Sequence, residues 1–244
     1  METKEIYWEL MGMLEAEATV IDVLSYQGKT VLILDQSLFY PEGGGQSGDR
    51  GIVIGPDGSM NVEDTRRVEG RIYHLGIIQG IIKSGDRIMM QIDQESRTYN
   101  SRCHSAGHLI SAVLEELSPG LEPVKAFHGK KAFVEYRGDV ERRIPSNLAV
   151  KVNEVMQKDA PVTCQTVSFE AIQNCPFIPK NSPKNNKSWR IMQIEGMVGI
   201  PCGGTHVKSL VEIGSIKIEK ILVKEGNTRV YYSIEFISPS QSTR

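Results

Sequence analysis

Two short motifs, 94 residues apart, contain side chains whose types and spacing could bind a metal ion. His104 and His108 are four positions apart in a stretch with helical spacing, so both side chains project from one helix face. Cys202 and His206 flank a Gly-Gly-Thr step, and the two glycines suit a tight turn that directs both side chains to one point. Thiolate with imidazole excludes magnesium and calcium by ligand type. The four residues therefore predict one Zn²⁺ per chain.

The sequence leaves the chemistry of that site open. Four protein ligands would close a tetrahedral shell, whereas three ligands and an open position would allow activation of water or of a carbonyl group. The residues between the histidines are Ser105, Ala106 and Gly107, so the glutamate of the His-Glu-x-x-His peptidase motif is absent. A peptidase is therefore disfavoured.

The other cysteines and histidines carry weaker predictions. Cys103 precedes His104 but points about 100° away from it on a helix, so we interpret it as a non-ligand. Cys164 and Cys175 have no paired spacing and are expected to be structural. His74 is assigned to the barrel surface. His128 is followed by Gly-Lys-Lys and could meet RNA or substrate.

A glycine-rich segment at residues 39–51 contains three consecutive glycines, Gly43, Gly44 and Gly45. Such a run lets the backbone approach a ligand or another domain closely. It has neither the spacing of a dinucleotide-binding loop nor that of a P-loop. Taken alone, it is typical of a barrel loop with a bulge.

Composition and charge bound the class of protein. The 244 residues have a net charge of −2, with 9 Lys/Arg against 16 Asp/Glu in residues 1–98 and 19 against 14 in residues 99–244. The part with the predicted metal site is therefore basic, which fits an anionic partner such as nucleic acid or is simply a solvated surface. No signal peptide or membrane-spanning stretch is apparent, and four scattered cysteines favour a reducing cytoplasm.

The first part of the sequence predicts a small β-barrel over residues 1–92. Short apolar runs alternate with Gly-containing turns, of which Gly28-Lys29 and Asp57-Gly58 are two. The expected strands cover residues 18–24, 31–35, 51–54, 60–62, 71–75 and 87–92.

The second part, residues 93–244, predicts an α+β domain. Helices are expected at 95–117 and at 148–159, the second capped by Ser146 or Asn147, and an exposed loop at 174–190. Strands are expected at 124–128, 131–136, 190–194, 215–223 and 228–237, with a turn at Gly226-Asn227. Helices beside strands that do not strictly alternate favour an α+β sandwich.

The order of these motifs resembles the editing region of alanyl-tRNA synthetase. The match runs from Phe39 to Gln46, through Asp49 and Gly51, to the two metal motifs. Further matches are Tyr7-Trp8, Glu212-Ile213-Gly214 and the run from Lys224 to Val230. Since the sequence holds no class II aminoacylation domain, it is similar to the free-standing alanyl-tRNA editing proteins, the AlaX family, of the medium-length type.

This resemblance implies a translation-factor-like barrel followed by a two-layer α/β sandwich editing domain shared with threonyl- and alanyl-tRNA synthetases. The zinc ligands of the family map onto His104, His108, Cys202 and His206. The implied reaction is ATP-independent hydrolysis of the ester that joins serine, with glycine as a second substrate, to alanine tRNA. Alanine on the same tRNA would be spared. The expected partner is alanine tRNA carrying a non-cognate amino acid.

Roles for further residues follow as hypotheses. Gln46 would lie near the zinc as a polar reader of the substrate, and Gly43 to Gly45 would hold the barrel loop against the editing domain. The candidate phosphate contacts are Lys125, Lys130, Lys131, Lys220 and Lys224. Two rivals stay open: a non-catalytic zinc-stapled RNA-binding module, and a metal-dependent hydrolase of another small ester or amide. The sequence also leaves open whether His206 or water is the fourth ligand, and the oligomeric state.

Overall fold

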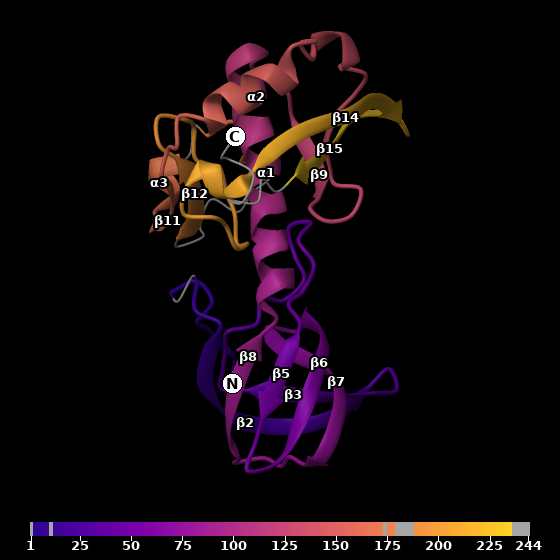
Figure 1. Ribbon diagram of the computed structural model, residues 1–244, viewed down its shortest axis with the longest axis vertical. Coiled ribbons are helices and arrows are strands. Elements are labelled where there is room, and N and C mark those ends of the chain that lie inside the picture. Colours follow the sequence, from indigo (N-terminus) through magenta and orange to yellow (C-terminus); the bar gives the residue numbers. More distant parts are fainter. Residues whose placement is uncertain (1, 10–11, 173–174, 179–187, 236–244) are drawn as a thin grey trace, which may run out of the picture. The chain divides into compact units, whose positions relative to one another are not determined.

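The computed structural model describes residues 2–9, 12–172, 175–178 and 188–235 (Figure 1). The chain divides into two compact units, Met1–Asn100 and Ser101–Arg244. The division falls within helix α1 (Gln94–Leu117), which contributes its first residues to one unit and the remainder to the other. The domain boundary expected between residues 92 and 93 stays a prediction.

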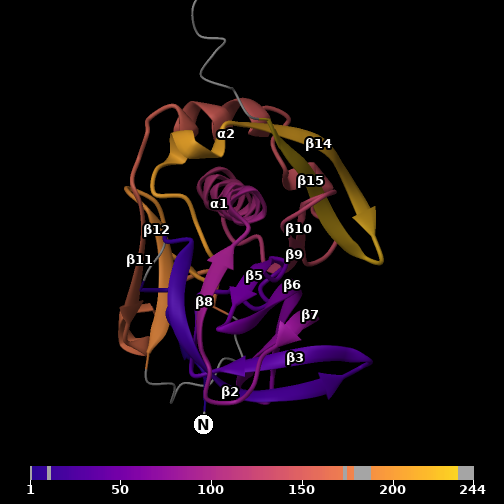
Figure 2. The same cartoon turned by 60° about the horizontal axis from the view of Figure 1, so that its bottom comes forward.

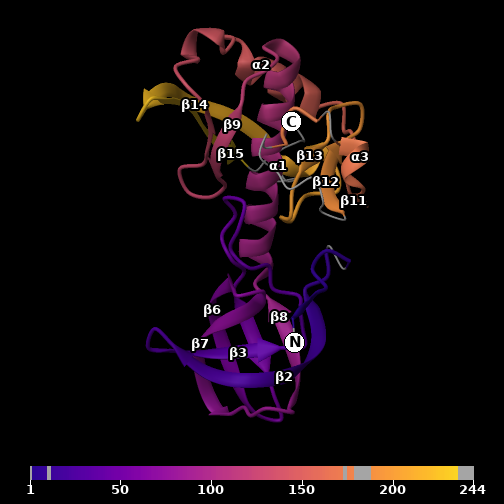
Figure 3. The same ribbon diagram turned by 180° about the vertical axis from the view of Figure 1, so that it is seen from behind.

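The first unit is a closed six-stranded barrel, which confirms the predicted barrel (Figures 1 and 3). Its strand order is β2-β3-β7-β6-β5-β8. The strands are β2 (Glu15–Tyr26), β3 (Lys29–Leu34), β5 (Gly51–Ile54), β6 (Asp57–Val68), β7 (Arg71–Ile81) and β8 (Arg87–Ile92). Strand β1 (Lys4–Glu5) pairs in parallel with β4 (Gln36–Ser37), and the two form a separate two-stranded sheet in the same unit.

Alternation along the strands places one set of side chains in the barrel interior. Val20, Leu32, Met60 and Met90 are almost completely buried there and pack in one cluster. The turn between β2 and β3 lies at Gln27 and Gly28, one residue before the predicted Gly28-Lys29, because Lys29 already belongs to β3. Both turn residues have positive φ, as the two-residue hairpin turns that match strand twist require.

The turn assigned to Asp57-Gly58 is wrong. The chain turns one step earlier, where the Gly55 N–H donates to the Gly58 carbonyl at 2.8 Å. Asp57 and Gly58 already belong to β6 and pair with β7. A Cβ on Gly58 would lie 2.5 Å from the backbone nitrogen of Ile81, so this glycine serves the close approach of two strands.

The assignment of His74 to the barrel surface is also wrong, because its side chain is completely buried. Its Nδ1 lies 2.9 Å from the Leu32 carbonyl, to which it donates, and its Nε2 lies 2.8 Å from the Ser37 hydroxyl. Burial lowers the pKa of His74 to about 4, against a smaller opposing effect of the Leu32 hydrogen bond. The ring is therefore neutral at ordinary pH.

His74 should make the stability of the barrel depend on pH. In the unfolded chain His74 binds a proton below its ordinary pKa of about 6.5. In the folded chain it binds that proton only below about pH 4. Stability is therefore full above pH 6.5 and falls on acidification, by about 2 kcal/mol at pH 5 from this residue. Urea unfolding of the protein and of a His74→Gln variant at pH 7.5 and 5 checks this. Equal pH dependence in both would contradict it.

A buried ion pair fixes the glycine-rich segment within the first unit. Arg97, near the start of α1, donates from Nε to the Asp49 carboxylate at 2.9 and 3.0 Å and from Nη2 to the Leu38 carbonyl at 2.8 Å. Asp49 also accepts the Tyr40 N–H at 2.6 Å. The side chains of Arg97 and Asp49 are 7% and 0% exposed. The pair therefore ties both ends of the 40–49 segment to the helix.

The second unit contains two antiparallel sheets and the remaining helices. The four-stranded sheet has the order β14-β15-β10-β9 and the three-stranded sheet the order β11-β12-β13. In Figure 2 α1 is seen end-on, with β11 and β12 on one side and the four-stranded sheet on the other. The strands are β9 (Pro123–Phe127), β10 (Phe133–Tyr136), β11 (Val162–Val167), β12 (Trp189–Ile194), β13 (Ile200–Pro201), β14 (Ser215–Lys224) and β15 (Asn227–Glu235).

These elements confirm the mixed α and β character predicted for this region, and the two-layer arrangement stays a prediction. Besides α1 the helices are α2 (Leu148–Met156), α3 (Phe169–Ile172) and the 3₁₀ turns η1 (Glu141–Arg143) and η2 (Leu210–Ile213). Asn147 occupies the cap position of α2 but its side chain makes no capping hydrogen bond. The loop expected at 174–190 lies largely outside the described residues, as does the end of the strand expected to reach 237.

Helix α1 buries the apolar face that its sequence spacing predicts. Leu109, Ile110, Val113 and Leu114 are all buried. Among the described residues no helix is long and apolar enough to cross a membrane.

Candidate metal centre

The four predicted ligands come together in the second unit. His104 and His108 lie one turn apart on α1, and Cys202 and His206 lie on the segment between β13 and η2. Their ligand atoms are all within 4.8 Å of one another. The Cys202 sulfur is 3.4 Å from Nε2 of His104 and 3.2 Å from Nε2 of His206. One helix and one distant loop thus form a single donor cluster.

The cluster fits a metal ion. Zinc–nitrogen and zinc–sulfur bonds of ordinary length place tetrahedral ligand atoms about 3.3–3.6 Å apart, close to the sulfur–nitrogen distances observed. Within the described part of the chain, Nε2 of His108 is buried without a hydrogen-bond partner. A buried polar atom without a partner is costly, and a metal ion would satisfy it.

Burial sets the protonation states of the metal-free cluster. It lowers the pKa of His108 to about 3 and lowers the pKa values of His104 and His206 well below the usual range, with neighbouring histidines adding to the effect. The imidazoles are therefore neutral and able to donate lone pairs. Burial also raises the pKa of Cys202 to about 12, against the opposing effects of the Gly204 N–H and the Arg190 charge. A bound cation would reverse that shift, because metal binding and thiol deprotonation are coupled.

Serine and threonine side chains attach the ligand loop to α1. The Ser105 hydroxyl lies 3.2 Å from Nδ1 of His206 and accepts the Val207 N–H at 3.2 Å. One turn earlier, the hydroxyls of Ser101 and Thr205 are 2.7 Å apart. The contact at Nδ1 directs Nε2 of His206 toward the cluster, which is how outer hydrogen bonds orient metal-binding histidines.

Arg190, on β12, holds the same loop from the other side. Its Nη1 donates to the carbonyls of Cys202 at 2.9 Å and Gly204 at 2.8 Å, and its own carbonyl accepts the Cys202 N–H at 2.9 Å. Sequence reasoning missed this residue. The only signal was an arginine within an otherwise mainly apolar strand.

A further histidine, His128, lies beside the cluster. Its ring stacks on that of His104 with centroids 4.2 Å apart, and its Nδ1 lies 2.7 Å from the Tyr232 hydroxyl. Because Tyr232 donates to the Cys103 carbonyl at 2.9 Å, it accepts from His128, whose Nδ1 therefore carries the proton. Burial lowers the pKa of His128 to about 4, so Nε2 is an acceptor. A Cβ on Gly107 would lie 2.5 Å from this ring, which explains the glycine inside the His-x-x-x-His motif.

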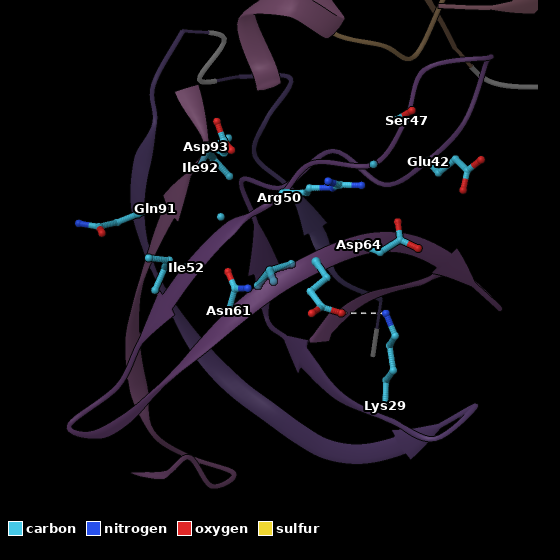
Figure 4. Close-up of a pocket in the computed structure, with 14 residues that line it drawn as sticks. Lys29, Glu42, Ser47, Arg50, Ile52, Asn61, Asp64, Gln91, Ile92 and Asp93 are labelled. Carbon is cyan, nitrogen blue, oxygen red and sulfur yellow. Dashed lines mark hydrogen bonds and ion pairs between the residues drawn. The ribbon is translucent and has the colours of Figure 1, made fainter. Parts of the chain in front are cut away.

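Cys103, Cys164 and Cys175 form no disulfide and lie outside the four-residue cluster. A separate cavity of about 900 Å³ lies on the barrel (Figure 4) and contains none of the predicted ligands. Its charged lining residues are Lys29, Glu42, Arg50, Glu63, Asp64 and Asp93. Four carboxylates against two cations make it a poor site for phosphate, and Lys29 already pairs with Glu63 at 2.8 Å.

Comparison with known proteins gives the relationships of the chain. The family of class II (A) tRNA synthetases matches residues 2–96, and the second additional domain of threonyl and alanyl tRNA synthetases matches residues 189–231. The chain is 33% identical over 238 residues to alanyl-tRNA editing protein AlaX-L of Pyrococcus horikoshii, covering 96% of this chain and 57% of the relative. It is 31% identical over 244 residues to alanyl-tRNA editing protein AlaX-M of Methanosarcina barkeri, covering 95% and 99%. The chain belongs to the AlaX family of alanyl-tRNA editing proteins.

Not every relative is matched over its full length. The alanine–tRNA ligase of Methanoregula boonei is 32% identical over 250 residues, which cover 94% of this chain but only 26% of the ligase. The chain thus spans little more than half of AlaX-L and about a quarter of this ligase. In AlaX-M it matches nearly the whole protein.

The remaining predicted residues of this AlaX chain lie apart in sequence from the four ligands. Gly43 and Gln46 close a small loop through mutual backbone hydrogen bonds of 3.1 and 2.9 Å, and the Tyr40 hydroxyl donates to the Gly43 carbonyl at 2.8 Å. The side chain of Gln46 is fully buried. The roles assigned to Gln46 and to Gly43, Gly44 and Gly45 stay predictions.

The five candidate lysines are all exposed and lie on or next to the four-stranded sheet. Lys125 is on β9, Lys130 and Lys131 are in the turn between β9 and β10, and Lys220 and Lys224 are on β14. Contact with tRNA stays a prediction for each of them.

Proposed function

We propose that this protein is a zinc-dependent deacylase that removes serine, with glycine as a second substrate, from alanine tRNA and spares alanine. The observation that carries the proposal is the convergence of His104, His108, Cys202 and His206 in one cluster of buried and half-buried side chains in a chain of the AlaX family. Relatives with AlaX names are called alanyl-tRNA editing proteins, which supports a role in editing.

The physical need for such an enzyme comes from the limits of binding selectivity. A pocket shaped for alanine cannot exclude the smaller glycine and rejects serine poorly. A second site built to hydrogen-bond a hydroxyl can discriminate against alanine, because its buried polar groups would lose their partner in the wrong complex. We propose Gln46 as one such polar reader.

The four ligands would hold zinc, which when bound would supply Lewis-acid polarisation and a lowered pKa for a coordinated water. Around it, Ser105 orients His206, and Arg190 fixes the backbone of the Cys202–His206 loop. His128 carries a proton at Nδ1 toward Tyr232 and keeps Nε2 as an acceptor beside His104. Ser105 and Arg190 would hold the ligands in place, and His128 would provide a proton acceptor. The reaction would require no ATP. We assign the activity to the cytoplasm.

The second candidate is a non-catalytic RNA-binding module in which zinc is purely structural. The observation that favours it is that four protein ligands are within reach of one ion, enough to close a tetrahedral shell. In that case the protein would bind alanine tRNA and leave its ester intact.

Release of serine from Ser-tRNA(Ala), followed with the zinc-loaded protein and after chelation, tests the proposal. The deacylase requires rapid release that chelation stops and added zinc restores. Tight binding of Ser-tRNA(Ala) with no release above the spontaneous rate would replace the deacylase with the binding module.

A further inference from the structure

The four-stranded sheet of the second unit carries a row of aromatic side chains across neighbouring strands. Phe127 on β9 pairs in register with Phe133 on β10, and Phe133 pairs with Tyr231 on β15. Ring centroids are 6.5 Å apart for the first pair and 5.5 Å for the second. Lys220 on β14 is the next residue in the same row.

This row lies on the sheet face opposite α1. The alternate residues Tyr136 and Tyr232 are buried and contact the helix, through the Ser111 hydroxyl and the Cys103 carbonyl respectively. Since successive side chains of a strand point to opposite faces, Phe133 and Tyr231 point away from α1. Figure 2 shows the helix on one side of this sheet only. Phe127 is 38% exposed, and Phe133 and Tyr231 beside it are half-buried.

Cations accompany the aromatic rings. The Lys220 ammonium lies 4.9 Å from the centroid of Tyr231, and the Arg229 guanidinium lies 4.6 Å from that of Phe133. Arg229 is paired with Glu135, the neighbouring carboxylate on this face. Among the described residues Lys220 and Lys224 have no carboxylate within ion-pair distance, so their charge is available to a ligand. Lys125 is exposed but lies opposite Glu135 in register, and its charge helps to lower the pKa of that carboxyl group.

The turn between β9 and β10 connects this surface with the metal centre. Phe127 is followed directly by His128, whose ring stacks on His104. The same turn exposes Lys130 and Lys131. A chain of phosphates and bases lying along the sheet could therefore continue past this turn toward the cluster.

Exposed aromatic side chains flanked by cations on an antiparallel sheet are what proteins use to bind single-stranded nucleic acid, because every base can stack on them. We propose that Phe127, Phe133 and Tyr231 stack the unpaired bases at the 3′ end of the tRNA, while Lys125, Lys220 and Lys224 contact its phosphates. This inference rests on the proposed function, since it takes tRNA as the partner.

Fluorescence anisotropy with deacylated alanine tRNA, intact or lacking its single-stranded 3′ end, tests this surface. The wild-type protein should bind the intact tRNA more tightly, and Phe127→Ala should weaken that binding about 5- to 100-fold. Phe127→Trp should retain it. Val150→Ala, at an exposed apolar residue on α2, is the matched control and should bind as the wild type does.

If Phe127→Ala does not fold, Lys220→Gln tests the same surface. This variant should reduce the magnitude of the slope of log affinity against log salt concentration by about one. The inference is overturned if folded Phe127→Ala binds intact tRNA as tightly as wild type. It is equally overturned if Phe127→Ala instead dissociates a dimer, which would make this face an interface with a second copy. Because the probe carries no amino acid, a wild-type protein that binds it but releases no serine would refute the deacylase and leave the surface standing.

Discussion

Replacing Cys202 with alanine is expected to reduce serine release from Ser-tRNA(Ala) at least about 100-fold and to abolish stoichiometric zinc binding. The Cys202 sulfur lies 3.4 and 3.2 Å from the Nε2 atoms of two histidines, so its loss removes one of four donors and the charge of a thiolate. The remaining imidazoles would be neutral and would hold a cation weakly. Zinc content by mass spectrometry and single-turnover deacylation measure the two effects.

Cys164→Ala is the matched control. Cys164 lies on β11 of the same unit and outside the donor cluster. It should keep both zinc and activity. Unchanged zinc content and rate in Cys202→Ala would remove Cys202 from the site. Lost activity with unchanged zinc would show that the sulfur acts on the substrate and not as a ligand.

Replacing Asp49 with alanine is expected to destabilise the barrel by about 3–5 kcal/mol, because Arg97 would be left charged, buried and without its carboxylate. The Tyr40 N–H would also lose its acceptor. Trp8 lies in the first unit and Trp189 in the second. Urea unfolding followed by Trp8 fluorescence in a Trp189→Phe background therefore reports on the barrel.

Glu17→Ala provides the comparison. Glu17 pairs with Arg87 at 2.9 Å on the barrel surface, where their side chains are 63% and 82% exposed. Exposed pairs contribute about 0–1 kcal/mol, so this change should shift the unfolding midpoint little. If Asp49→Ala and Glu17→Ala lose similar stability, the buried pair does not fix the glycine-rich segment.

The convergence of the four candidate ligands was the most predictable part of the molecule, because each half of the cluster is local. A spacing of four positions between His104 and His108 on a helix, or a Gly-Gly-Thr step between Cys202 and His206, fixes the directions of the two side chains relative to one another. The barrel was predictable for the same reason, since glycine-containing hairpin turns mark strand ends, although the turn predicted at Gly28-Lys29 lies one residue earlier. The residues that surround the cluster were not.

His128 and Arg190 reach the site by tertiary packing that no local pattern encodes. His128 arrives through the pairing of β9 with β10, and Arg190 through the pairing of β12 with β13. The wrong assignment of His74 has a similar origin, because a histidine in an alternating strand reads as polar until its buried partners, Leu32 and Ser37, are known. The turn predicted at Asp57-Gly58 was wrong because a glycine can also be required where two strands approach closely, as Gly58 is.

Side-by-side deacylation of Ser-, Gly- and Ala-tRNA(Ala), with zinc-loaded and zinc-stripped protein, tests the central claim most directly. The zinc-loaded protein should release serine and glycine, and it should release alanine at least about 100-fold more slowly than serine. Removal of zinc should abolish the release of all three amino acids. Alanine released as fast as serine, or serine release indifferent to zinc, would contradict a zinc-dependent editing site.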